Sequence, residues 1–495
     1  MSLSTDTLPA QEHIAVADPA LLHTASYIQG NWLSTPATAV LPVSNPATGQ
    51  TIATVNAADV KDAEHAVEAA HAAFSAWSAR LPQERAAILK QWHILLLQHQ
   101  RDLALIMTLE QGKPLSEAHG EIDYAASFVE FFAEEAKRPD ILSVTSHLPS
   151  AEVEVWREPV GVAALVTPWN FPIAMITRKA AAALAVGCTV VVHPSQETPL
   201  SALALAELAE RAGFPAGVFN VVVGEPATIV GSWTKNPRVR ALSFTGSTAI
   251  GRLLYQQCAP TIKRLSLELG GHAPFLVFAD ADLDKAVTEA IKAKFATSGQ
   301  DCLGANRFYI ERPVYAEFCR RFTEQTQALS IGPGIDDPDI GPLMNPAAVA
   351  KQQEQVADAL DKGARLLCGG AVHALGPLFF SPTVLADVPP EAKIFHEETF
   401  GPIAAIAPFD DEQTVIRQAN ATEYGLIAYL HTRDPARIYR ISRALEFGMI
   451  GVNRSKVTGA PIPFGGMKQS GLGREGSRHG IEAFSDVKYV CRDWS

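Results

Sequence analysis

The chain has 495 residues, of which 47% are hydrophobic and 19% are charged, and its formal net charge is −12. This length predicts more than one domain, and this composition predicts a soluble globular protein rather than a disordered one. The negative charge includes no long charged run and argues against nucleic acid as a partner, because phosphate binding needs a basic surface.

The helical pattern comes first along the chain. Residues 1–25 are polar and aperiodic, and are predicted to form a loose tail. Apolar residues at helical spacing then predict a helix over 59–80 and one or two helices over 82–111. After a break at 112–114, a further helix is predicted to run through Arg138.

From residue 160 short apolar runs alternate with helical segments. The predicted strands are 162–166, 189–192, 221–223, 241–244 and 308–310, and the predicted helices are 172–185, 201–212 and 283–296. Strands that alternate with helices imply parallel sheets. The chain is therefore predicted to be an α/β protein with two parallel-sheet domains that meet near residue 268.

Cysteine usage and apolar runs limit the class further. None of the six cysteines forms a C-x-x-C pair or a cluster with histidine, so reduced thiols and no metal site are expected. The apolar run 180–192 is too short to cross a membrane. The first basic residue is Lys61, which argues against a secretory or transit peptide. A cytoplasmic protein without a membrane partner is expected.

Three segments indicate a reaction class. Cys302 lies in a glycine-containing turn 34 residues after Glu268, and Asn170 lies between Trp169 and Phe171. A thiol and a carboxylate placed in this way suggest covalent catalysis at carbon followed by hydrolysis, and an amide can polarise a carbonyl. Taken alone, Asn170 could cap a turn and Glu268 could be a surface carboxylate.

These motifs resemble the aldehyde dehydrogenase superfamily over residues 27–491. The matching segments, in order, are 168–172, 244–247, 268–271, 299–302, 398–402 and 463–466. The resemblance implies NAD(P)-dependent oxidation of a small-molecule aldehyde to a carboxylic acid. Such a reaction would pass through a thiohemiacetal and a thioester on the catalytic cysteine.

The resemblance also implies a division of the chain. An NAD(P)-binding domain would comprise 26–138 and 159–267, and a catalytic domain would comprise 268–475. A small β oligomerisation arm would come from 139–158 and 476–495. A homodimer or homotetramer is expected.

By the same resemblance, Cys302 is the nucleophile, and the Asn170 amide and the backbone N–H of Cys302 are the oxyanion donors. Glu268 is the general base that activates water against the thioester. The retention of Glu268 argues against CoA-acylating oxidation. The three intact residues argue against a catalytically silent structural member of the fold. A cofactor-free cysteine hydrolase is disfavoured because no histidine motif pairs with Cys302 and the cofactor motifs would be unexplained.

The predicted cofactor residues are Thr167, Pro168, Trp169, His193, Ser195, Gln196, Gly246, Ser247, Glu398 and Phe400. Small residues in the G-x-x-x-x-G spacing that begins at Gly246 would let a pyrophosphate approach a helix N-terminus. The G-x-G-x-x-G at 471–476 follows no predicted strand and is set aside as a decoy. The resemblance places Glu398 at the nicotinamide ribose and Phe400 against the ring.

The expected coenzyme is NAD, with NADP as the alternative. The family usually has a lysine where this chain has His193, and NAD-preferring members commonly have glutamate where it has Gln196. The sequence therefore lacks both the usual cation and the usual anion. Ser195 could hydrogen-bond a phosphate, and Glu197 could replace the missing acid.

On the substrate side, the segment around Arg178 resembles the succinate-semialdehyde dehydrogenase group. Arg178 would bind a carboxylate at the far end of the aldehyde, or else form a structural salt bridge. Ala296 stands where that group has a second arginine, and Thr458 keeps a hydroxyl. Arg454 and Lys456 in the same loop could replace the lost charge. The predicted substrate is a semialdehyde such as succinate semialdehyde; another ω-oxo acid or an amino- or guanidino-aldehyde is the alternative.

Overall fold

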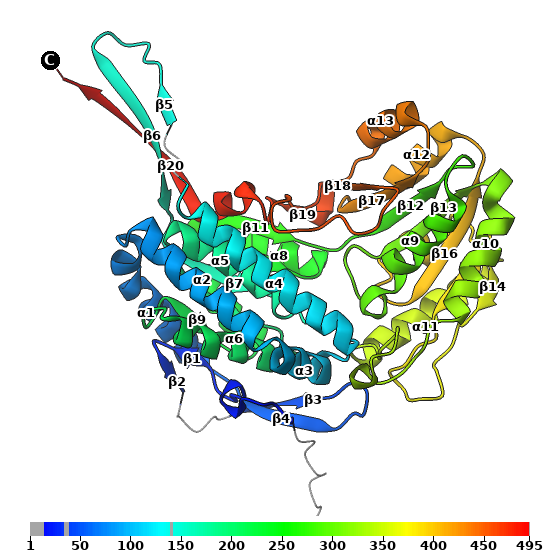
Figure 1. The fold of residues 1–495 in the computed structure, drawn as a ribbon, viewed down its shortest axis with the longest axis horizontal. Helices are drawn as coiled ribbons and strands as arrows, with labels where there is room; N and C mark the ends of the chain where they lie inside the picture. The colour runs from blue at the N-terminus through cyan, green and yellow to red at the C-terminus, as the bar shows by residue number, and fades with distance from the viewer. Residues whose placement is uncertain (1–13, 34–38, 139–141, 495) are drawn as a thin grey trace, which may run out of the picture.

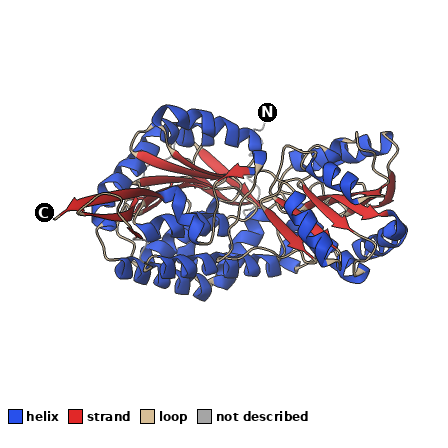
Figure 2. Cartoon of the chain, turned by 90° about the horizontal axis from the view of Figure 1, so that it is seen from above, coloured by secondary structure: helices blue, strands red, loops and turns tan. Residues whose placement is uncertain are grey.

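The computed structural model describes residues 14–33, 39–138 and 142–494. Figure 1 shows two bodies, each built around a β-sheet, and a narrow arm that projects from the first body. Figure 2 shows helices on both sides of the sheets. The predicted α/β class with two parallel-sheet units and a small β arm is confirmed.

The first body begins with short strands and four helices. A hairpin of β3 (Val40–Ser44) and β4 (Thr51–Asn56) precedes α1 (Val60–Ser78), α2 (Pro82–Gln98), α3 (Gln100–Gln111) and α4 (Leu115–Glu135). Asp59 caps α1 by accepting hydrogen bonds from two N–H groups of its first turn. The region 82–111 forms two helices, and Gly112 ends the second with a φ of 91°.

The first sheet has the order β19-β11-β10-β7-β8-β9-β1-β2. Its strands are β1 (Tyr27–Ile28), β2 (Asn31–Trp32), β7 (Val162–Val166), β8 (Thr189–His193), β9 (Phe219–Val221), β10 (Val239–Thr245), β11 (Arg264–Glu268) and β19 (Gly471–Leu472). Its other helices are α5 (Ala174–Val186), α6 (Pro199–Ala212), α7 (Pro226–Lys235) and α8 (Thr248–Cys258). The strands from β11 to β9 are parallel. The chain proceeds from β7 to β8 on one side and later reaches β10 on the other, a switch point at which α/β sheets open a ligand crevice.

The second sheet has the order β14-β15-β16-β13-β12-β17-β18. Its strands are β12 (Ala273–Val277), β13 (Ala305–Glu311), β14 (Arg365–Cys368), β15 (Thr383–Ala386), β16 (Ile403–Phe409), β17 (Ile427–His431) and β18 (Met449–Val452). The helices of this body are α9 (Leu283–Phe295), α10 (Arg312–Gln327), α11 (Pro346–Asp361), α12 (Glu412–Asn420) and α13 (Pro435–Ala444). Only a short link separates the end of β11 at Glu268 from the start of β12 at Ala273.

The arm is a three-stranded antiparallel sheet with the order β20-β6-β5. It pairs β20 (Ser485–Asp493) with β6 (Ala151–Pro159) along their whole length, and β6 with β5 (Leu142–Val144). Large apolar side chains on β20 remain exposed, with Val487 at 63% and Tyr489 at 71%.

Three details differ from the sequence predictions. Residues 14–25 are not a loose tail: Ile14 and Leu21 are buried, and Asp102 accepts the backbone N–H groups of residues 17 and 18. The rest of the predicted tail, residues 1–13, lies outside the described residues. The strand predicted at 221–223 is Phe219–Val221. Residues 471–472, predicted to be in the second unit, pair with β11 in the first sheet.

None of the helices within the described residues is long and apolar enough to cross a membrane.

Candidate active site

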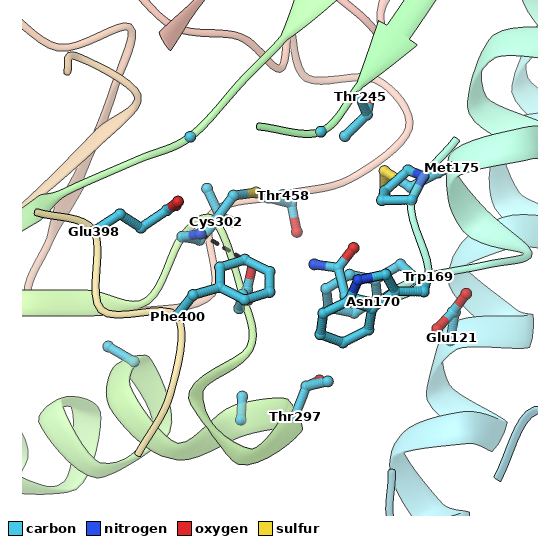
Figure 3. Close-up of a pocket in the computed structure, with 18 of the residues that line it drawn as sticks. Glu121, Trp169, Asn170, Met175, Thr245, Thr297, Cys302, Glu398, Phe400 and Thr458 are labelled. Atoms are coloured by element: carbon cyan, nitrogen blue, oxygen red, sulfur yellow. Dashed lines mark hydrogen bonds between the residues drawn. The ribbon is translucent and has the colours of Figure 1, made fainter. Parts of the chain in front are cut away.

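A cavity of about 760 Å³ is lined by residues that follow the carboxyl ends of β7, β10 and β11 in the first sheet and by residues of the second body. Both bodies contribute to its wall, including Asn170 and Arg178 from the first and Cys302 and Glu398 from the second. In Figure 3, Cys302 lies near the centre, with Glu398 to one side and Asn170 to the other. The structure therefore brings together several residues that are far apart in the sequence.

A strained turn presents Cys302 to the cavity. Thr297 and Ser298 have positive φ values of 50° and 56°, and the Thr297 N–H donates to both carboxylate oxygens of Glu117 at 3.0 Å. Gly271 packs against the backbone of Cys302, since an added Cβ would lie 2.2 Å from the carbonyl oxygen of Cys302. Burial and the charge of Asp301 raise the pKa of the Cys302 thiol well above its usual value.

Buried contacts fix the Asn170 loop. The side-chain amide of Asn170 donates to the carbonyl of Gln300 at 3.0 Å, which leaves its second N–H for another acceptor. The backbone carbonyl of Asn170 accepts from Lys113 Nζ at 2.7 Å. Lys113 pairs with Glu121 at 2.5 Å, and Glu121 also accepts the N–H groups of Ile173 and Ala174 at the start of α5. Lys113 and Glu121 were not singled out from the sequence.

Glu268 is the last residue of β11. It is 2% exposed, and neither carboxylate oxygen has a hydrogen-bond partner among the described residues. Burial, reinforced by the charge of Glu475, raises its pKa well above the usual value. Glu268 does not line the cavity, although the next two residues, Leu269 and Gly270, do.

Arg178 forms the structural salt bridge that was one of the two interpretations of the sequence. Its Nε donates to Glu475 at 2.5 Å in a buried salt bridge, and its guanidinium lies 4.1 Å from the centre of the Phe464 ring. It also lines the cavity. Glu475 further pairs with Lys179, whose Nζ donates to Thr245 at 2.7 Å. Lys179 and Glu475 were missed because they are 296 residues apart in the sequence.

Of the residues predicted to bind substrate from the loop after β18, only some line the cavity. Thr458 lines the cavity, as does Lys456. Arg454, predicted as a substrate residue, is not among the lining residues, so the structure does not bring it to the site. Ala296, at the position of the missing arginine, is exposed and also lines the cavity.

Part of the cavity wall is formed by residues that the sequence predicts to bind the nucleotide. These are Pro168, Trp169, Gly246, Ser247, Glu398 and Phe400. Ser247 caps α8, whose N-terminal N–H groups suit a pyrophosphate. Glu398 accepts the Gly271 N–H at 2.8 Å, and Trp169 meets Phe400 edge to face at 5.6 Å. These residues fit a nicotinamide dinucleotide. Thr167 is buried and does not line the cavity.

The remaining predicted cofactor residues, His193, Ser195 and Gln196, lie at and after the end of β8 and do not line the cavity. His193 is 2% exposed and its Nδ1 contacts the Val222 carbonyl at 2.9 Å. Burial lowers the pKa of His193 to about 4, so its imidazole is uncharged at neutral pH. Gln196 donates to the Gly224 carbonyl at 2.9 Å, and the Ser195 hydroxyl donates to Glu197.

Comparisons with known proteins agree with this geometry. The model of the aldehyde dehydrogenase family matches residues 32–490. Succinate-semialdehyde dehydrogenase [NADP(+)] of Escherichia coli is 52% identical, covering 96% of this chain and 98% of that protein. Glutarate-semialdehyde dehydrogenase of Pseudomonas aeruginosa is 50% identical, with the same coverage of 96% and 98%. A crystal structure of succinate-semialdehyde dehydrogenase from Burkholderia pseudomallei superposes with a TM-score of 0.96 at 50% identity, covering 97% of this chain and 100% of that one.

Proposed function

The chain belongs to the aldehyde dehydrogenase family, and from this premise we propose that it oxidises a carboxylate-bearing semialdehyde to a dicarboxylic acid with NAD or NADP. Succinate and glutarate semialdehyde are the favoured substrates. One observation carries this proposal: the thiol of Cys302 and the buried cation of Arg178 line a single cavity. The thiol suits the aldehyde and the guanidinium suits the carboxylate.

Cys302 is the proposed nucleophile. Because the pKa of its thiol is raised, the thiol proton must pass to a base, either Glu268 or a water molecule, as the sulfur attacks the carbonyl carbon. The free N–H of the Asn170 amide and the backbone N–H of Cys302 stabilise the developing oxyanion. A bound nicotinamide coenzyme, held by Trp169, Glu398 and Phe400, would supply the hydride acceptor. Glu268 then accepts a proton from the water that hydrolyses the thioester.

The expected coenzyme preference depends on the charge of His193. An uncharged, buried imidazole offers no cation to a 2′-phosphate, and the Ser195 hydroxyl is engaged with Glu197. We expect NAD to be used at least as well as NADP.

The proposed divisions of the chain are the NAD(P)-binding, catalytic and arm segments predicted above, with 471–472 moved to the first unit. The apolar side chains exposed on β20, including Tyr489, support a role of the arm in a homodimer or homotetramer. A cytoplasmic location is proposed as well.

The test compares kcat/KM for succinate semialdehyde with that for butanal, its uncharged equivalent, in wild type and Arg178→Leu. The variant should weaken the semialdehyde reaction by roughly 1.5–3 kcal/mol, the range for a charged hydrogen bond, and leave butanal little changed. Thermal unfolding serves as the control, because Glu475 loses one of its two cations. Equal damage to both substrates would make Arg178 structural. A wild-type preference for butanal would contradict the proposed substrate class but not the family.

A further inference from the structure

Lys292, Ala296 and Lys456 are exposed residues of the cavity wall, and we call this part of the wall the mouth. Arg178, by contrast, is 1% exposed and already paired with Glu475. The cavity wall therefore carries the buried cation of Arg178 and, at the mouth, the two exposed lysines Lys292 and Lys456.

The two lysines differ in their partners. Lys292 pairs with Glu289 at 3.2 Å, one turn earlier on α9. No hydrogen bond or ion pair joins Lys456 to another of the described residues. The charge of Lys456 is therefore available to a ligand, whereas that of Lys292 is partly compensated.

The loop that carries Lys456 is anchored beside the mouth. Both the backbone N–H and the hydroxyl of Ser455 donate to one carboxylate oxygen of Glu289, each at 2.6 Å. Glu289 thus pairs with Lys292 and also holds the residue next to Lys456. Arg454, on the other side of Ser455, is exposed but does not line the cavity.

We propose that Lys456 is a second substrate-binding cation, which contacts the distal carboxylate of an ω-oxo acid whose aldehyde lies at Cys302. This role rests on the proposed function and narrows its substrate class. A longer ω-oxo acid places its carboxylate farther from Cys302 and closer to the mouth. Acids of five or six carbons should therefore depend on Lys456 more than the four-carbon acid does.

The exposure of Lys456 determines how its contribution to substrate binding should appear in the kinetics. A flexible, solvated ammonium contributes modestly to binding and is screened by salt. Its effect should therefore appear in KM rather than kcat, and should shrink at high ionic strength.

The experiment compares Lys456→Met with Arg454→Met, which removes the same charge from the same loop outside the cavity. Steady-state kinetics would use ω-oxo acids of four, five and six carbons, plus butanal and pentanal, at low and high salt. Lys456→Met should raise KM for the five- and six-carbon acids by roughly two- to tenfold with kcat unchanged. Lys456→Arg should restore most of the loss. Arg454→Met, and both neutral aldehydes, should show no change.

Several outcomes would overturn this role. These are an equal effect of Arg454→Met, an equal loss for neutral aldehydes, or a loss that does not depend on acid length. A wild-type preference for neutral aldehydes would overturn the proposed function and the role of Lys456 with it. An unchanged preference for anionic substrates in Lys456→Met would overturn only the role of Lys456.

Discussion

Replacing Glu268 with glutamine removes a base while keeping the shape of the side chain. In the structure the Glu268 carboxylate is buried and unpartnered, and its pKa is raised by burial. A carboxyl with such a pKa is better matched to proton transfer near neutral pH than an ordinary one. A positioned general base contributes typically about 10²–10⁴-fold, or roughly 2.7–5.5 kcal/mol of barrier. We expect thioester hydrolysis to slow by that factor.

The pH dependence of stability gives an independent check. Because the folded pKa of Glu268 is raised, the folded state binds this proton more tightly than the unfolded state. Its contribution to stability is fully present below the unfolded pKa of about 4.3 and is lost as pH rises through the folded pKa. The melting temperature of Glu268→Gln should therefore increase relative to wild type as pH is raised.

The kinetic assay is rapid mixing followed by intact-mass analysis. Glu268→Gln should show a burst of NADH stoichiometric with subunits, then slow turnover, and an acyl adduct on Cys302. The double variant with Cys302→Ala should show neither burst nor adduct. If activity is lost without a burst or an adduct, Glu268 acts in an earlier step, such as deprotonation of the thiol. Normal turnover would refute the reasoning altogether.

Other variants test further parts of the site. Cys302→Ala should abolish oxidation while NADH still binds in a fluorescence titration; residual turnover would identify a different nucleophile. His193→Lys should raise kcat/KM with NADP more than with NAD, and a wild type that strongly prefers NADP would contradict our expectation. Lys113→Met should leave Glu121 as a buried unpaired charge and lower stability in denaturant unfolding by about 3–5 kcal/mol. Adding Glu121→Gln should recover part of that loss, and a negligible effect of the single variant would contradict the importance of this pair.

Local sequence signals were enough for the α/β class, most helices and the family. Strand 162–166 was predicted at its observed bounds, and the helix predicted at 283–296 ends one residue earlier. These elements are encoded by the periodicity of neighbouring residues. The family followed from short motifs, each of which is contiguous in the sequence.

Long-range contacts account for what the sequence could not show. Residues 14–25 look like a tail because their partner, Asp102, lies on α3. Of the two cations that flank Ser455, Lys456 lines the cavity and Arg454 does not. The contact that holds Ser455 comes from Glu289 on α9, which is distant in the sequence. Neither of these long-range contacts produces a periodic pattern or a motif in the segments that it joins.

The ion cluster of Arg178, Lys179 and Glu475 has a consequence for biosynthesis. Its two cations lie on α5, but their carboxylate is made 296 residues after Lys179. At a synthesis rate of about 5–20 residues per second, Glu475 is synthesised roughly 15–60 s after Lys179 on α5. During that interval the nascent first body can bury this face of α5 only around two uncompensated cations, which is unfavourable. Final packing of the first body is thus tied to the arrival of a segment that follows the second body in the chain.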